Sequence, residues 1–172
     1  EVGWRILIEN DVRLARLVAS NSYCPESVRL DLTCHPDAEV SAKAWSALNF
    51  KTSTMAEKLS EKLESLFSDP FLEDDRSVVA GNPSIGAPII SRLMECSAKV
   101  TRVLASNKNL TESDRAALLQ SGDHQTAANA VDYTSSGVLM RLGSKHASPE
   151  VRAVVAGRVG PCATKLRFIL AT

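Results

Sequence analysis

The stretch Leu17-Val18-Ala19-Ser20-Asn21 decides the fold, because it recurs in altered form along the chain and returns as Val103-Leu104-Ala105-Ser106-Asn107. Runs of this kind end in six alanines, separated by 28, 33, 25, 25 and 26 residues: Ala19, Ala47, Ala80, Ala105, Ala130 and Ala156. A repeat of this length predicts stacked supersecondary units, since one such unit cannot bury its own apolar face.

Two further positions recur with the alanine. An asparagine stands two residues later in four copies, as Asn21, Asn49, Asn82 and Asn107, and Asp132 and Arg158 replace it in the last two. Asparagine tolerates the left-handed backbone conformation and bonds to nearby main-chain groups, so we expect it to end a short helix. A second apolar residue follows the alanine by 12 or 13 positions: Leu32, Leu59, Leu93, Leu118, Leu142 and Ile169. Each unit therefore carries two apolar anchors.

Helix-start signals lie between these anchors. Pro25-Glu26, Thr111-Glu112-Ser113-Asp114 and Ser148-Pro149-Glu150 place cap residues, prolines and acids where helices begin. The pattern predicts a unit of short helix, tight turn, longer helix and tight turn. Because about 25 residues leave little room, we expect the first helix to be one or two turns long and of 3₁₀ type.

Several segments resemble the leucine-rich repeat variant family: Leu17 to Val28, His35 to Val40, Val78 to Pro83 and Ser148 to Ala156. The resemblance extends from about Val12 to about Phe168. It implies an all-α, right-handed α-solenoid of about six short two-helix repeats, similar to HEAT repeats, in a single domain over residues 1–172. The family has no shared activity, so the resemblance implies a fold and no reaction. A founding type carries a cysteine-rich iron–sulfur region, which has no counterpart here.

The residues that could carry chemistry are scattered. Cys24, Cys34, Cys96 and Cys162 fall in different repeats without ligand spacing, and we expect buried structural thiols. His35, His124 and His146 fall in expected turns, and the glycines are isolated turn residues rather than a phosphate loop. Cys34 or Cys96 could meet a histidine in space, but spacing does not support a catalytic pair. We therefore expect a protein that is not an enzyme and has no cofactor or metal.

Composition restricts the partners. The chain has 172 residues with 20 basic and 20 acidic side chains, and its zero net charge gives no general attraction to nucleic acid or anionic membrane. No apolar run reaches the length of a membrane span, and no signal-peptide pattern opens the chain. A cytoplasmic protein with reduced thiols is expected. The stretch of residues 163–172 ends abruptly on apolar residues although terminal repeats need a polar outer face, so self-association through the C-terminal end is one expectation.

An insertion is expected over residues 55–75, in the widest spacing. Met55, Leu59, Leu63, Leu66 and Phe67 form one helical apolar stripe, and Pro70 stops this helix before an acidic segment. One interpretation is a partner-binding loop, with Phe71 as an exposed anchor and the acids as its rim. The other is a longer helix packed on the core, followed by a solvated run of charges.

A stripe of basic residues indicates an alternative function, which is binding of nucleic acid. We place Arg16 and Arg102 at one repeat position and Lys43, Arg76 and Arg152 at the next, where they would contact phosphates or acidic partners. They could equally be solvent-facing arms whose stems cover the core. We expect a non-enzymatic scaffold that binds another macromolecule, with protein favoured over nucleic acid. Trp4, Tyr23 and Trp45 would be aromatic anchors if exposed, although Trp45 replaces an aliphatic residue and is expected to be buried.

Overall fold

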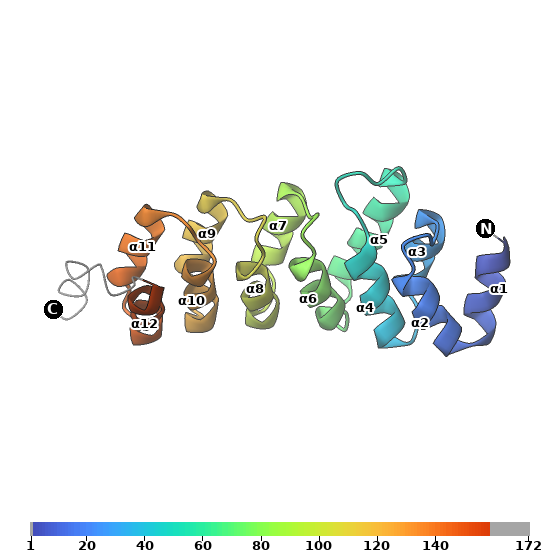
Figure 1. Ribbon diagram of the computed structural model, residues 1–172, viewed down its shortest axis with the longest axis horizontal. Helices are drawn as coiled ribbons and strands as arrows, with labels where there is room; N and C mark the ends of the chain where they lie inside the picture. The colour runs from blue at the N-terminus through green and yellow to red at the C-terminus, as the bar shows by residue number, and fades with distance from the viewer. Residues whose placement is uncertain (1, 159–172) are drawn as a thin grey trace. The chain divides into compact units, whose positions relative to one another are not determined.

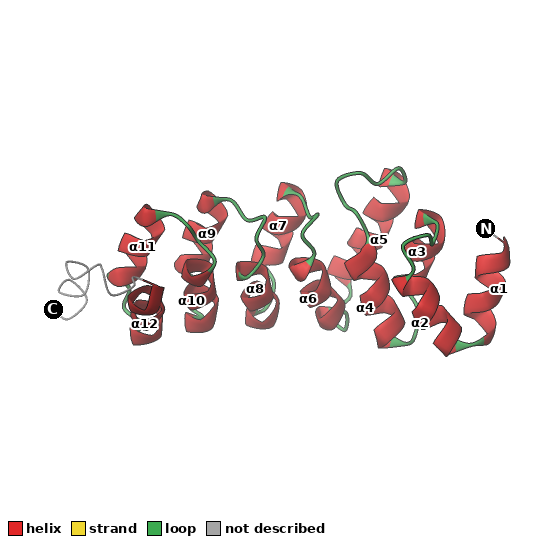
Figure 2. Ribbon diagram, viewed as in Figure 1, coloured by secondary structure: helices red, strands yellow, loops and turns green. Residues whose placement is uncertain are grey.

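The computed structural model describes residues 2–158, and within them the chain is entirely α-helical, with twelve helices and no strand (Figures 1 and 2). The helices are α1 (Val2–Asn10), α2 (Val12–Ser20), α3 (Glu26–Leu32), α4 (Ala38–Ala47), α5 (Ala56–Ser68), α6 (Glu73–Gly81), α7 (Ala87–Met94), α8 (Ala98–Ala105), α9 (Glu112–Leu119), α10 (His124–Asp132), α11 (Gly137–Ser144) and α12 (Pro149–Arg158). None of these helices is long and apolar enough to cross a membrane.

The chain divides into two compact units, Glu1–Leu93 and Met94–Thr172. In the first unit α4 packs against α2, α3 and α6, while α5 contacts α3 and α6. In the second unit α10 packs against α8, α9, α11 and α12. Within each unit the even-numbered helices form one layer, and the odd-numbered helices from α3 onward form the other (Figure 1).

The starts of the even-numbered helices correct the alignment of the alanines. They are separated by 26, 35, 25, 26 and 25 residues, from Val12, Ala38, Glu73, Ala98, His124 and Pro149. The seventh residue after each start is Ala19, Trp45, Ala80, Ala105, Val131 or Ala156, and the first five of these are buried. Ala47 is exposed, because two further residues along a helix turn a side chain to another face. Trp45 and Val131 therefore hold the positions expected of Ala47 and Ala130, although Ala130 is itself buried.

Two details of local geometry differ from expectation. Every described helix is an α-helix, even α3 with its seven residues, so the expected 3₁₀ helices are wrong. The asparagines do not use the left-handed conformation: Asn21 and Asn82 have φ of −79° and −71°, and no described non-glycine residue has positive φ. Their side-chain oxygens instead accept the main-chain N–H two residues ahead, at 2.9 Å for Tyr23 and 2.8 Å for Ser84.

The helix expected within residues 55–75 is confirmed as α5, which is 13 residues long and ends before Pro70. Leu59 and Leu66 are buried on its inner face. The acidic segment is not a free loop, because Glu73-Asp74-Asp75 forms the first turn of α6, where negative charge is favourable near the helix N-terminus.

Small and apolar side chains build the cores. One cluster in the first unit gathers Ala15, Val18, Ala19, Cys24, Val28, Leu32, Val40 and Ala44, and one in the second gathers Leu119, Ala127, Ala128, Val131, Leu139, Val151 and Val155. Cys24 is buried as expected, but Cys34 is exposed and Cys96 half-buried. Cys162, Ile169 and the apolar C-terminal residues lie outside the described residues.

The last expected anchor within the described residues, Leu142, also differs from expectation. Leu142 is exposed, while Leu139 and Gly143 of α11 are buried. Gly143 is a packing residue rather than a turn residue, since a Cβ there would lie 2.9 Å from Val155 Cγ2 and 3.0 Å from Val131 Cγ2. The glycine lets α11 approach its neighbours closely.

Candidate functional site

Arg16 and Arg102, the first pair of the expected basic stripe, both bind carboxylates that start the next even-numbered helix. Arg16 donates to Asp37 at 3.2 and 2.7 Å, and Arg102 donates to Asp123 at 2.9 and 2.7 Å. Each aspartate is the N-cap of its helix, α4 or α10. Hydrogen bonds from the arginines are the largest effect on these carboxyls, and the pKa of both aspartates lies below the ordinary value.

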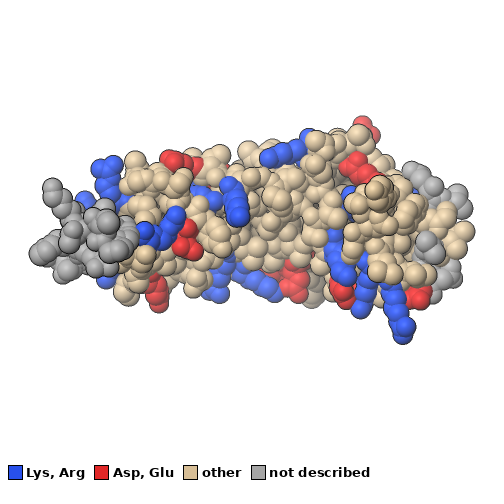
Figure 3. All heavy atoms as spheres, viewed as in Figure 1, with Lys and Arg blue, Asp and Glu red and all other residues tan. Residues whose placement is uncertain are grey.

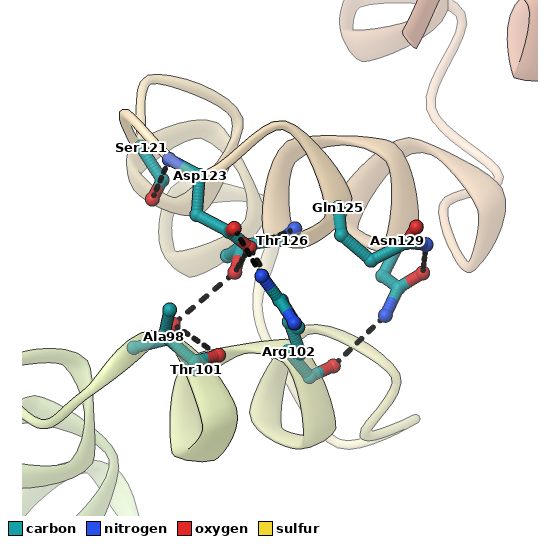
Figure 4. A network of polar contacts seen from close by, with 8 residues as sticks. All are labelled: Ala98, Thr101, Arg102, Ser121, Asp123, Gln125, Thr126 and Asn129. Atoms are coloured by element: carbon teal, nitrogen blue, oxygen red, sulfur yellow. Dashed lines mark hydrogen bonds and ion pairs between the residues drawn. The ribbon is translucent and has the colours of Figure 1, made fainter. Parts of the chain in front are cut away.

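Figure 4 shows how the second pair is embedded in the layer of even-numbered helices. Asp123 also accepts hydrogen bonds from the main-chain N–H and the hydroxyl of Thr126, at 2.8 and 2.7 Å. The Thr126 and Thr101 hydroxyls lie 3.1 Å apart, and Asn129 donates to the Arg102 carbonyl at 3.0 Å. The guanidinium is thus one part of a network that joins α8 to α10.

The other three residues of the stripe are also engaged. Arg76 donates to the carbonyls of Leu66 and Asp69 at 2.9 and 2.8 Å, and Arg152 donates to those of His146 and Ala147 at 2.7 Å each. Lys43 pairs with Glu39 at 2.9 Å.

The stripe is also less regular than expected. Arg76 and Arg152 are the third residues after their helix starts, but Lys43 is the fifth after the start of α4, so its expected position was wrong. Both units show basic and acidic side chains interspersed on the face in Figure 3.

A cavity of about 450 Å³ in the first unit is the strongest candidate site. It lies among α4, α5, α6 and the turn between α3 and α4, and we call it the α4–α6 cavity. Its lining combines aromatic, acidic and small side chains: Thr33, Cys34, His35, Pro36, Ala38, Ser41, Trp45, Lys62, Ser65, Leu66, Asp69, Phe71, Leu72, Asp74 and Asp75.

Trp45 forms part of the cavity wall. Its side chain is buried and stacks on Phe50, with ring centroids 6.4 Å apart and an interplanar angle of 2°. The indole Nε1–H has no hydrogen-bond acceptor among the described residues. An unpaired buried donor costs free energy, and this nitrogen is itself buried rather than open to the cavity.

Asp75 supplies a half-buried carboxyl to the same cavity. Ser41 Oγ lies 3.1 Å from Asp75 Oδ2 and 2.7 Å from the Thr33 carbonyl, so one hydroxyl hydrogen serves two acceptors. Burial raises the pKa of Asp75 above the ordinary value, and the neighbouring charge of Asp74 raises it further. Asp75 forms no ion pair with a described residue, so a cation is the group its environment lacks.

Phe71 is 92% exposed although it is a large aromatic side chain. Asp69 Oδ1 accepts the Phe71 main-chain N–H at 2.9 Å, which fixes the turn between α5 and α6. The two interpretations of the insertion each describe a part of it: α5 packs on the core, while Phe71 stands in solvent beside carboxylates. Tyr23 is 87% exposed and also lies in the first unit, but it does not line the cavity.

Two further residues that line the cavity are Cys34 and His35, whose thiol and imidazole are not hydrogen-bonded to each other. Lys62 Nζ donates to Cys34 Sγ at 3.3 Å. His35 Nδ1 accepts the Asp37 main-chain N–H at 3.0 Å, so this nitrogen holds a turn and is not available as a base. No three described His, Cys, Asp or Glu side chains are grouped so that they could hold a metal ion.

Sequence reasoning identified Phe71 and the acidic segment that contains Asp75, but it did not place Ser41 or Trp45 beside them in one cavity. The signal that could have found them was the helix start at Asp37, which aligns Trp45 with the buried alanines of the other copies.

Comparisons with known proteins add no relative: no family model matches the sequence, and no curated protein or solved structure is significantly similar to it.

Proposed function

We propose that this chain is a non-enzymatic scaffold that binds a protein partner at the α4–α6 cavity, with Phe71 as the exposed anchor. The observation that carries the proposal is the 92% exposure of Phe71 at the edge of a cavity that has a buried tryptophan in its wall. Aromatic side chains beside a hollow dominate the energy of many protein interfaces. The packed α5 gives this anchor a rigid base.

The proposed architecture is a right-handed α-solenoid of the leucine-rich repeat variant type. Support comes from the spacing of the helix starts, which is 25 or 26 residues except for the 35-residue interval that contains α5. The paired bonds of Arg16 and Arg102 add support, because they join consecutive even-numbered helices in the same way. We further propose a cytoplasmic location, which agrees with the free thiols of Cys24 and Cys34.

The bonds that the basic side chains make within the fold favour a protein partner over nucleic acid. Phosphate binding needs cations that are free to replace counterions along a backbone. The five candidates Arg16, Lys43, Arg76, Arg102 and Arg152 are instead bonded to carboxylates or main-chain carbonyls. Their interactions hold helices and turns in place.

Site-specific crosslinking tests the proposal. A photoreactive phenylalanine replaces Phe71 in one variant and Tyr23 in another, and each is irradiated in lysate of the source organism with and without nuclease. We expect a discrete protein adduct from position 71 that nuclease does not change and that position 23 does not give. Equal adducts at both positions, or an adduct that nuclease abolishes, would reject this site.

A further inference from the structure

Helix α11 of the second unit (orange in Figure 1) carries two exposed apolar side chains on one side. Val138 is 57% exposed and Leu142 is 52% exposed. They follow one another by a single helical turn and therefore lie on the same side of the helix. The neighbouring side of α11 supplies Leu139 and Gly143 to the core, so the buried packing of α11 is made by other residues.

The same two positions are polar or small or hold proline in the other odd-numbered helices from α3 onward. Val138 and Leu142 are the second and sixth residues of α11. The corresponding pairs are Ser27 and Asp31, Glu57 and Glu61, Pro88 and Arg92, and Ser113 and Ala117. In α5 and α9 both residues of the pair are exposed, although other helices pack against α5 and α9. Packing between helices therefore does not explain why α11 has apolar residues at these positions.

Two cations accompany the apolar pair. Arg141 and Lys145 stand three and seven residues after Val138, so they share its side of the helix, and we call these residues together with Leu142 the α11 face. Both basic side chains are exposed, and neither forms an ion pair with a described residue. Arg141 donates only from Nε, to the Gly137 carbonyl at 3.4 Å. In contrast to the arginines of the expected stripe, these two cations are available to a carboxylate of a partner.

The charge of the second unit favours an acidic partner. Residues 94–172 contain 10 basic and 6 acidic side chains, whereas residues 1–93 contain 10 basic and 14 acidic side chains. An acidic protein segment is therefore attracted to the second unit and repelled by the first. An apolar pair one turn apart, flanked by cations, is complementary to an amphipathic segment with acidic residues beside its apolar side. A membrane surface matches less well, because an interfacial helix needs a large continuous apolar face.

We propose that the α11 face binds an acidic amphipathic segment of a partner protein. The apolar pair packs against the apolar side of that segment, and the two cations pair with its carboxylates. The α11 face shares no residue with the α4–α6 cavity. The inference therefore goes beyond the proposed function and does not depend on it.

Three blocked, fluorescently labelled peptides test the charge and the apolar contact separately. They are (Glu-Leu-Leu-Glu)₃, (Gln-Leu-Leu-Gln)₃ without the charge, and (Glu-Ser-Ser-Glu)₃ without the apolar side. Binding to the full chain is measured by fluorescence anisotropy. We expect the first peptide to saturate, with an affinity that falls as salt is added, and the other two to bind on the order of tenfold more weakly. Equal binding of either counterpart, or no saturation by the first peptide at millimolar protein, would overturn the inference.

Variants locate the binding on α11. Leu142→Ala and Lys145→Glu should each weaken binding of the first peptide on the order of fivefold, because they remove an apolar contact and reverse a pairing charge. The matched controls are Val103→Ala and Lys108→Glu, which change an exposed apolar residue and an exposed lysine of the second unit outside the α11 face. Each control should change the affinity less than about twofold. An equal effect of Lys108→Glu would show attraction to net charge alone and would reject the site.

Vesicles test the other class of partner. The full chain and the Lys145→Glu variant are sedimented with vesicles of phosphatidylserine and phosphatidylcholine. We expect neither protein to sediment with the vesicles. Sedimentation of the full chain that Lys145→Glu abolishes, without binding of the first peptide, would assign the α11 face to an anionic membrane and overturn the inference.

Discussion

Arg102 of α8 and Asp123 at the start of α10 form two hydrogen bonds of 2.9 and 2.7 Å, in the side-by-side geometry that suits a guanidinium and a carboxylate (Figure 4). Arg16 and Asp37 form the same contact between α2 and α4, at the same sequence separation of 21 residues. Because each aspartate also caps its helix, one contact fixes both the start of a helix and its distance from the preceding even-numbered helix.

The first prediction concerns the pH dependence of this contact. Arg102→Ala should lower the free energy of unfolding at pH 7. Since Arg102 lowers the pKa of Asp123 below its ordinary value of 3.8, the stabilisation is present above that value and is lost as pH falls through the lower folded-state pKa. Urea unfolding at pH 7, 4 and 2.5 measures the difference, which should shrink across the series. Arg141→Ala is the control, because Arg141 is exposed and, among the described residues, its guanidinium hydrogen-bonds only to the Gly137 carbonyl. A difference that stays constant with pH would contradict the ion pair.

The second prediction concerns Asn82, which is buried at the end of α6. Its side-chain nitrogen donates to the carbonyls of Trp45, Ser46 and Leu48 at 3.0 to 3.1 Å, so it satisfies the last turn of α4. Asn82→Ala should destabilise by about 3 kcal/mol, since it leaves buried carbonyls without donors.

Asn49 provides the matched control for Asn82. It makes the same local turn, accepting the Lys51 main-chain N–H at 3.1 Å, but it is exposed. Asn49→Ala should therefore cost less than about 1 kcal/mol by chemical denaturation. Equal losses in the two variants would mean that the hydrogen bonds from Asn82 to the carbonyls at the end of α4 contribute nothing to the free energy of unfolding.

The sequence predicts the helical class and the periodicity because both depend on local patterns of apolar and capping residues. It does not predict the geometry at Asn82, because an asparagine that bonds to the preceding even-numbered helix has the same local pattern as one that caps its own helix. The basic residues show the same limit of prediction from local sequence. Arg76 and Arg152 were placed on a basic stripe by spacing alone, whereas their carbonyl partners are fixed by the way the turns fold back.

The sequence does not predict the α4–α6 cavity, for a similar reason. Asp75 and Trp45 are 30 positions apart in sequence and meet only through the packing of α4 and α6. Phe71 could be identified because it follows a helix-stopping proline in an acidic segment, and this pattern is local in the sequence.

The third prediction concerns the free-energy cost of Asp75. Its folded-state pKa is raised by burial, so its charge opposes folding at neutral pH, and this cost disappears as pH falls through the raised folded-state pKa to below 3.8. Asp75→Asn should stabilise the free protein at pH 7 on the order of 1 kcal/mol, because the amide can donate to Ser41 Oγ. The gain should vanish at pH 3 in thermal unfolding. A loss of stability at pH 7 would show that the carboxylate has a favourable partner in the fold.

The last prediction distinguishes the two alignments of the copies. Ala105 is fully buried between helices, so Ala105→Leu should overpack this contact and destabilise by about 1 to 3 kcal/mol. Ala47 was aligned with Ala105 by the sequence pattern, but its side chain is exposed at the end of α4. Ala47→Leu should therefore change the free energy of unfolding by less than about 0.5 kcal/mol. Thermal and urea unfolding of both variants make the comparison. A large loss in both variants would restore the alanine alignment and remove Trp45 from the equivalent buried position.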